Sequence, residues 1–167
     1  VVDGTTYTQG GYGRVYEWNN NTDNWDLMNF QLDSNYNNFA GDMIYGFANN
    51  YLTIKAISSD GNTIAIGASG EWNNNGATYA EVYTYNGTNW VIKGTRFTGD
   101  SLFGVNMSLN SSGNIVSVAS CKYTSGGLGN RGRVQVFEWV SNAWQQIGSD
   151  ILGAGANYYL GRSSKLN

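Results

Sequence analysis

The sequence predicts an all-β protein made of repeated four-stranded antiparallel units. Glycine occurs 23 times in 167 residues and asparagine equally often, which indicates many tight turns. Aromatic residues make up 14% of the chain and charged residues only 13%, a balance that suits short, half-buried strands. Val105, Met107 and Leu109 alternate with polar residues, which is the period-2 pattern of a strand with two unlike faces. No stretch shows a convincing helical period of 3.6 residues.

The composition excludes several kinds of site. The chain has no histidine, so histidine metal sites and Ser-His-Asp or Cys-His catalysis are excluded. Its single cysteine, Cys121, allows neither an internal disulfide nor a cysteine zinc site. We interpret it as a small buried residue, with pairing to another chain as the alternative. A net charge of −3 argues against nucleic acid as a partner, and no apolar run is long enough to predict membrane insertion.

Three markers recur along the chain and define a repeat. The first is an alternating strand that ends in an aromatic residue and is followed by a loop and a tryptophan. The second is a Gly-Asp turn that leads to an aromatic residue and a glycine, and the third is a turn of the Ser-x-Gly-Asn type. The first occurs at 13–18 with Trp25, 80–85 with Trp90 and 133–139 with Trp144; the second at 41–46, 99–104 and, more loosely, 155–161; the third at 57–62 and 109–114.

Each unit is predicted to contain four short strands. In the best-defined copy these strands lie at about 105–110, 114–120, 132–139 and 144–149. Ser112-Gly113 joins the first two, and Asp60-Gly61 stands at the same place in the preceding copy, which is a hairpin-turn signal. The loop before Trp144 closes the second hairpin of the unit.

The markers make the chain a single repeat domain, 1–167. Its units lie at about 1–46, 47–104 and 105–161, and 162–167 would supply the first strand of a next unit; a loop insertion is expected near 47–52. Antiparallel units that repeat every 50–60 residues predict β-propeller-type blades, because a parallel β-helix has much shorter repeats. About three repeats fall below the usual number of blades, so we expect a partial propeller or one completed by oligomerisation.

These motifs together resemble a known repeat family. Gly-Asp-x-x-Phe-Gly ends at Phe103-Gly104, and Ser-x-Asp-Gly-Asn-x-Ile-Ala-Ile-Gly-Ala ends at Gly67-Ala68. Followed by Gly-x-Val-x-Val-Tyr-x-Trp-like strands, this order is similar to the FG-GAP-type propeller repeats of extracellular and cell-surface proteins. The resemblance spans the whole chain. The proline after Gly-Ala and the Asp-rich calcium loop that some of these propellers carry, as in integrin α subunits, are missing, so the resemblance implies no calcium.

Unpaired strand edges are expected at both ends of the chain. It opens at the tail of a second strand, Val1-Val2, and closes on the lone first strand 162–167. The chain is then a window on a longer propeller, a complete protein whose last strand finishes the first unit of a neighbour, or an open array of three units. The expected partners are the remainder of a longer chain or further copies, joined by strand addition.

Carboxylates are the remaining acid–base groups. Glu17 and Glu138 precede a tryptophan in different units, so we expect exposed strand residues that do not converge as a glycosidase requires. Asp42 and Asp100 recur in the Gly-Asp turn, where we expect them to cap backbone N–H groups rather than bind a metal. The sequence therefore predicts no catalytic residue, no metal site and no cofactor.

One tryptophan is the candidate ligand contact. Five of the six tryptophans are repeat-equivalent, which predicts packing between units. Trp72 lies outside this pattern in the Asn-rich loop 71–75, and we predict that it contacts a glycan. Tyr158 and Tyr159 are a weaker alternative.

Four asparagines occupy N-glycosylation sequons. Asn20 and Asn86 lie in the same hairpin loop of successive units, and Asn110 opens a turn, so we predict glycosylation at these three. Asn106 lies in mid-strand and is disfavoured.

The predicted function is a non-catalytic structural or adhesion module at the cell surface or outside the cell. It would be a β-propeller segment of a surface or filament-forming glycoprotein, with rigid sheets that display loops. Because a fold does not determine a function, two alternatives stay open. A lectin-like module would bind polysaccharide through Trp72, and a carbohydrate-active enzyme would need two carboxylates in one pocket.

Overall fold

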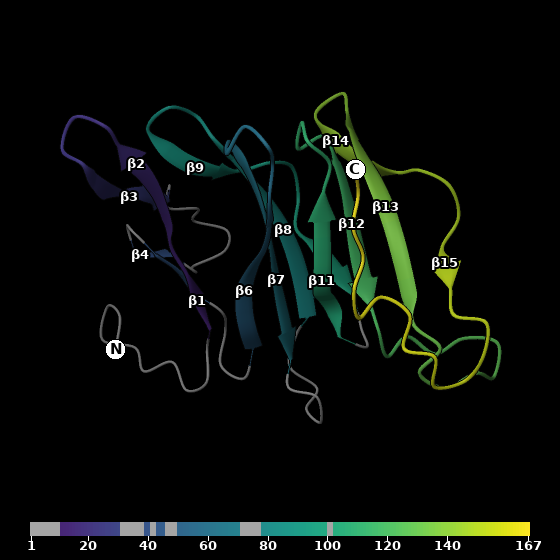
Figure 1. The fold of residues 1–167 in the computed structure, drawn as a ribbon. Helices are drawn as coiled ribbons and strands as arrows, with labels where there is room; N and C mark the ends of the chain where they lie inside the picture. The colour runs from purple at the N-terminus through teal and green to yellow at the C-terminus, as the bar shows by residue number, and fades with distance from the viewer. Residues whose placement is uncertain (1–10, 31–38, 41–42, 46–49, 71–77, 100–101) are drawn as a thin grey trace.

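The computed structural model describes residues 11–30, 39–40, 43–45, 50–70, 78–99 and 102–167. These residues form fifteen β-strands and no helix, so the predicted all-β class is confirmed (Figure 1). The first hairpin, the central strands and the last sheet follow one another across the molecule, from purple to yellow-green.

The central sheet is an antiparallel meander of four strands, as predicted for one unit. A short fifth strand returns to pair with the third strand of the meander. These strands are β6 (Asn50–Ile57), β7 (Thr63–Gly70), β8 (Thr78–Tyr85), β9 (Asn89–Ile92) and the returning β10 (Phe97–Gly99).

The last sheet repeats this topology. Four antiparallel strands again run in chain order, and a short fifth strand again pairs with the third. The strands are β11 (Phe103–Leu109), β12 (Ile115–Ser120), β13 (Arg133–Val140), β14 (Ala143–Gln146) and β15 (Ile151–Leu152). All four strands predicted for this unit are present, with bounds that differ by a few residues.

The first unit departs from the repeat. It forms the hairpin β2 (Val15–Asn19) and β3 (Asn24–Phe30), and a separate small sheet of β1 (Tyr12–Gly13), β5 (Met43–Tyr45) and β4 (Phe39–Ala40). Strand β3 pairs in parallel with β9, which joins the hairpin and the central sheet into one curled, seven-stranded sheet. The sequence did not predict that β3 and β9, which belong to different units, would pair. None of the repeated motifs marks a pairing between units.

Two hairpin turns form where the sequence places them. In the central sheet, Asp60 Oδ1 accepts hydrogen bonds from Ser58 Oγ at 2.6 Å and Asn62 N at 3.0 Å, and Gly61 has a φ of 74°. These bonds hold the pKa of Asp60 below its usual value, the bond from Ser58 contributing most. In the last sheet, Gly113 has a φ of 65°, which glycine adopts without strain. The Asp-Gly and Ser-Gly signals therefore identified real turns.

Two apolar cores lie on opposite faces of the central sheet. One is shared with the first hairpin and the other with β11 and β12. Strand β8 contributes to both, since Tyr79 and Tyr83 enter the first core and Ala80 and Val82 the second. The alternation of side chains along a strand thus buries β8 on both faces. Cys121 is also buried, as predicted, and burial raises the pKa of its thiol.

Two expectations for the strand boundaries are wrong. The segment 162–167 is not a strand; instead Ser164 N and Leu166 N donate to the side chains of Asn106 and Ser108, each at 3.0 Å. Side-chain acceptors take the place of a backbone ladder here. Residues 47–49 of the loop insertion expected near 47–52 lie outside the described residues, whereas 50–52 belong to β6, and Leu52 is fully buried in the first core.

Candidate functional site

An exposed aromatic surface covers the outer side of the first hairpin. It consists of Tyr16, Trp18, Trp25 and Leu27, and we call it the hairpin face. These side chains are 45, 41, 59 and 37% exposed, respectively. Such a concentration of large apolar side chains on one face is typical of an interaction surface.

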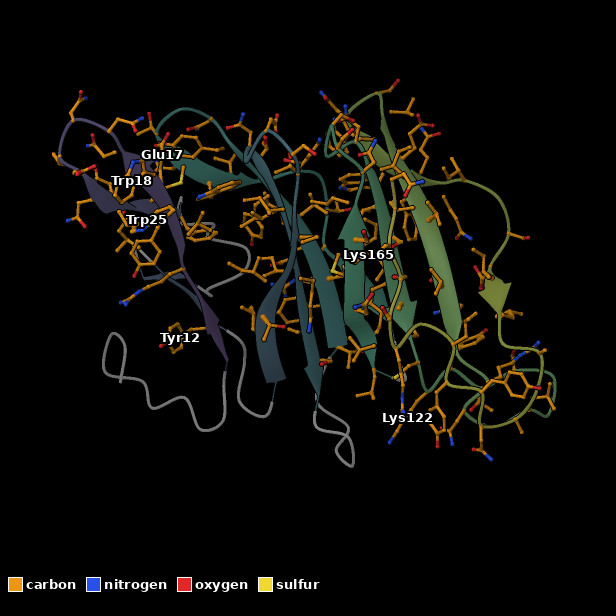
Figure 2. All side chains as sticks on the ribbon, in the orientation of Figure 1. Tyr12, Glu17, Trp18, Trp25, Lys122 and Lys165 are labelled. Atoms are coloured by element: carbon orange, nitrogen blue, oxygen red, sulfur yellow. The ribbon has the colours of Figure 1, made fainter. Side chains whose placement is uncertain are left out.

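Strand geometry places these four side chains together. Residues two apart share a side of a strand, so Tyr16 and Trp18 project from one side of β2. The hairpin register sets Tyr16 opposite Leu27 and Trp18 opposite Trp25. The two indole rings meet edge to face, with centroids 5.2 Å apart (Figure 2). The alternate residues Val15 and Met28 pack into the first core instead.

A polar rim borders the tip of the hairpin. Glu17 lies opposite Asp26 in the register, and Asn19 Nδ2 donates to Asp26 Oδ2 at 2.6 Å. Trp18 Nε1 donates to Asn20 Oδ1 at 3.1 Å. These groups line a cavity of about 380 Å³ at the tip. Carboxylate, amide and indole groups side by side are suited to hydrogen bonding and stacking with sugars.

A larger apolar groove lies between the hairpin and the central sheet. Its volume is about 670 Å³, and its walls include Tyr16 and Trp25 from the hairpin and Ile54 and Ile57 from β6. Lys55 also lines it, and burial lowers the pKa of this lysine. The groove has no sequence signal, because it arises from the curl of the sheet.

The hairpin face has a covered counterpart in the last sheet. Trp139 and Trp144 face each other in the β13–β14 register with centroids 5.2 Å apart, as Trp18 and Trp25 do. They pack on the corner Lys93-Gly94 that follows β9, where Trp144 Nε1 donates to the carbonyl of Lys93 at 2.6 Å. The Lys93 ammonium lies 5.6 and 5.5 Å from the two indole rings.

The corner lysine is also fixed from its other side. Lys93 Nζ donates to Gly113 O and Asn114 Oδ1, each at 2.8 Å, and both acceptors lie in the β11–β12 turn. Burial lowers the pKa of Lys93, and Asp60 opposes this shift. The corner thus links the central and last sheets.

A phenylalanine completes this junction, and a second phenylalanine lies beside aromatic residues of the central sheet. Phe97 lies 4.8 Å from Phe137 and 6.0 Å from Trp144 between ring centroids. In the first core, Phe30 lies 5.8 Å from Tyr83 and 6.3 Å from Trp90. Phe30 is the strand partner of Trp90 in the parallel β3–β9 pairing, whereas Phe97 contacts Phe137 and Trp144 of a separate sheet that packs against the central sheet.

The structure only partly supports the expectation that repeat-equivalent tryptophans pack between units. Trp90 is fully buried, and Trp139 and Trp144 are half-buried between sheets. Trp18 and Trp25 are exposed, contrary to the prediction, because no described strand covers the outer side of the hairpin. The sequence shows that these tryptophan positions are equivalent. It does not show that Trp18 and Trp25 are left exposed by the described strands.

The predicted carboxylates and ligand residues fall in different places. Glu17 is exposed on β2 and Glu138 is half-buried on β13. Trp72, Asp42 and Asp100 lie outside the described residues. The proximity of Glu17 to Asp26 was missed, because it depends on the hairpin register, which the sequence analysis did not assign. Within the described ranges, no three Asp, Glu, His or Cys side chains gather as a metal site would require.

The weaker aromatic candidates are separated by their exposure. Tyr158 is 66% exposed, whereas Tyr159 is half-buried and its ring lies 4.6 Å from the Arg162 guanidinium.

The predicted glycosylation asparagines differ in their bonding. Asn20 and Asn86 are exposed, and Asn86 Oδ1 accepts bonds from Thr88 N and Asn89 N. Asn110 is half-buried; its Oδ1 accepts two backbone bonds, and its Nδ2 donates to Ser112 Oγ at 3.1 Å. The nitrogen that would carry a glycan is therefore engaged at Asn110.

No protein-family model matches the chain, and a search of the curated proteins finds no match. The FG-GAP resemblance therefore stays a prediction. Among the described residues there is no helix of sufficient length and apolar character to cross a membrane.

Proposed function

We propose that this chain is a segment of an FG-GAP-type β-propeller that acts as a non-catalytic structural or adhesion module outside the cell or at its surface. The observation that carries the proposal is the topology shared by the central and last sheets, in which four antiparallel strands run in chain order and a short fifth strand pairs with the third. These two sheets pack against each other, with Phe97 of the central sheet lying against Phe137 and Trp144 of the last sheet. Blades of a propeller are four-stranded sheets of this kind, repeated along the chain.

The surface favours an extracellular role. Low charge and many asparagines give a hydrated surface, and the sequons at Asn20 and Asn86 lie in exposed hairpin loops. A glycan attached there would point into solvent without disturbing either core. The proposal assigns no catalytic residues, and it places the function in surfaces and loops.

Adhesion of the folded chain to cells tests the proposal. Beads coated with the chain are expected to adhere to cultured cells or extracellular matrix under flow, and beads coated with the heat-unfolded chain are not. Equal adhesion of both bead types would contradict the proposal. Release of reducing sugar from polysaccharides would do the same, because it requires a catalytic site.

Sugar binding is a second candidate, favoured by the tip of the first hairpin. There the exposed Trp18 ring stands beside Asn20 and the Asn19–Asp26 pair. A glycan array compared among the native chain, Trp18→Ala and Trp72→Ala separates the possibilities. Loss of signal in Trp18→Ala alone would place the site at the tip, and loss in Trp72→Ala alone would place it in the 71–75 loop. Absence of any signal would eliminate the lectin function.

A further inference from the structure

We infer that the hairpin face binds the opposite end of a second copy of this chain, so that the chain associates head to tail. The inference specifies the partner of the proposed structural module and rests on that proposed function. A chain that stays monomeric would overturn the inference, while the adhesion assay on dilute, bead-bound chain would still test the module itself.

The hairpin face is the exposed equivalent of the surface that Trp139 and Trp144 form in the last sheet. Trp18 and Trp25 are equivalent to Trp139 and Trp144 in register, in ring separation and in sequence position. The later pair is covered by the corner after β9, and the earlier pair is exposed.

The last sheet carries an exposed corner that is equivalent to the covering corner Lys93-Gly94. Gly148 follows Trp144 by four residues, as Gly94 follows Trp90, and their φ angles are 71° and 86°. A Cβ added to Gly94 would lie 2.6 Å from the Trp139 ring. A Cβ added to Gly148 would meet no heavy atom within 4 Å among the described residues.

The residue that fills the internal junction also has an exposed equivalent in the last sheet. Phe97 pairs with Ala80 on the third strand of its sheet, and Ile151 pairs with Val134 at the equivalent place in the last sheet. Phe97 is packed between aromatic rings, whereas Ile151 is 54% exposed. Together with Gly148 and the exposed Ile147 and Leu152, it forms what we call the tail face.

The hairpin face and the tail face are therefore the two halves of one junction. They lie at opposite ends of the row of sheets (Figure 1), so a single molecule cannot join them to each other without a second copy. An interface between two different patches is heterologous, and it produces a ring if the rotation closes and a filament if it does not. A second copy of the chain carries the complementary surface, because every copy has both faces.

The internal junction predicts the contacts of the intermolecular one. Trp25 Nε1 would donate to the main-chain carbonyl of the residue at position 147, as Trp144 Nε1 donates to that of Lys93. Because isoleucine replaces lysine at this corner, the intermolecular junction lacks the cation–π contact. Association should therefore depend on apolar burial and change little with salt concentration.

Analytical ultracentrifugation across the micromolar range tests the association. The native chain is expected to show species heavier than 18.2 kDa that grow with concentration. The head variant Trp18→Ser/Trp25→Ser and the tail variant Ile147→Asp/Ile151→Asp should each weaken association by about thirtyfold or more, as loss of interface hot spots does. Tyr12→Ser, which removes an exposed side chain that belongs to neither face, is the matched control and should leave association unchanged.

Mixing the two variants distinguishes a lost surface from a lost fold. The head variant keeps an intact tail face and the tail variant an intact hairpin face, so the mixture should form a one-to-one dimer that does not extend further. A native chain that is monomeric at every concentration would overturn the inference. Undiminished assembly of either variant, or a mixture that stays monomeric while the native chain associates, would also overturn it.

Discussion

At the scale of single residues, two glycines show how packing adds to backbone conformation. Gly94 and Gly148 both adopt a positive φ at the corner that follows the fourth strand of a sheet. The Gly94 corner lies under two indole rings, and the Gly148 corner is open among the described residues. Any side chain at either position has the same backbone strain, but only one of them also meets a neighbouring sheet.

Alanine substitution should separate these two effects. Gly148→Ala is expected to lower the free energy of unfolding by about 1–2 kcal/mol through backbone strain. Gly94→Ala should cost about 1–3 kcal/mol more, since Trp139 and Trp144 must move to admit the methyl group. Urea unfolding of both variants measures the difference, and equal costs would show that the aromatic rings do not press on Gly94.

A buried ion pair is the second residue-scale feature. Glu81 is fully buried on β8, and its Oε1 lies 2.6 Å from Arg96 Nε. The Tyr83 hydroxyl donates to Glu81 Oε2 at 2.9 Å, and the Arg96 guanidinium lies 4.0 Å from the Tyr79 ring centroid. The sequence did not predict this cluster, because arginine and glutamine stand at the equivalent positions 14 and 135.

Breaking the pair should be costly and removing both charges much less so. Arg96→Met leaves the Glu81 carboxylate buried without this partner, and the expected loss of stability is about 3–5 kcal/mol. The double variant Glu81→Leu/Arg96→Met should recover most of that loss. Chemical denaturation of the single and double variants checks this, and additive losses would contradict the coupling of the two charges.

Glycan occupancy provides a third test at this scale. In a eukaryotic secretory host, we expect Asn86 to be occupied more fully than Asn110, because the Asn110 amide nitrogen is hydrogen-bonded to Ser112 and its oxygen holds the turn. Peptide mass spectrometry gives the occupancy of each sequon. Higher occupancy at Asn110 would mean that this turn forms after glycosylation.

At the scale of elements, alternation and turn signals predicted most of the strands. The Asp60-Gly61 and Ser112-Gly113 signals mark real hairpins, and the strands of the last sheet lie within a few residues of their predicted bounds. Two features escaped prediction for one reason. The β3–β9 pairing and the side-chain bonds of 162–167 both depend on which partner lies nearby, and a strand's own sequence does not specify its partner.

The candidate site could also be predicted from the sequence only in part. The equivalence of the tryptophan pairs follows from sequence position, and their edge-to-face contact follows from the hairpin register. The exposure of Trp18 and Trp25 depends on what covers the hairpin, so only the structure reveals it.

At the scale of the whole molecule, the first core contains two buried tyrosines that respond to alkaline pH. Burial raises the pKa of Tyr79 and of Tyr83 well above the usual value for tyrosine, and the charge of Glu81 raises both further. Both hydroxyls therefore stay protonated in the folded chain at a pH where they ionise in the unfolded chain.

Stability should fall as pH rises above about 10, the ordinary pKa of tyrosine. The unfolded chain then binds fewer protons than the folded chain, so each tyrosine lowers the unfolding free energy by up to about 1.4 kcal/mol per pH unit. The lowered pKa of Lys55 and Lys93 acts in the opposite direction, but only up to about pH 10.5. Circular dichroism across this range measures the slope, and Tyr79→Phe should reduce it; an unchanged slope would contradict this assignment.

The double burial of β8 has a consequence for how such a protein can change in length. One set of its side chains serves the preceding unit and the other set serves the following unit. Duplication of a whole unit would therefore supply the added sheet with an apolar set of side chains for each of its neighbours. Gain or loss of half a unit would instead leave a sheet with one face unmatched. Recombination between sequences built from such units should then be tolerated in steps of one full repeat, which makes the number of units an easily varied trait.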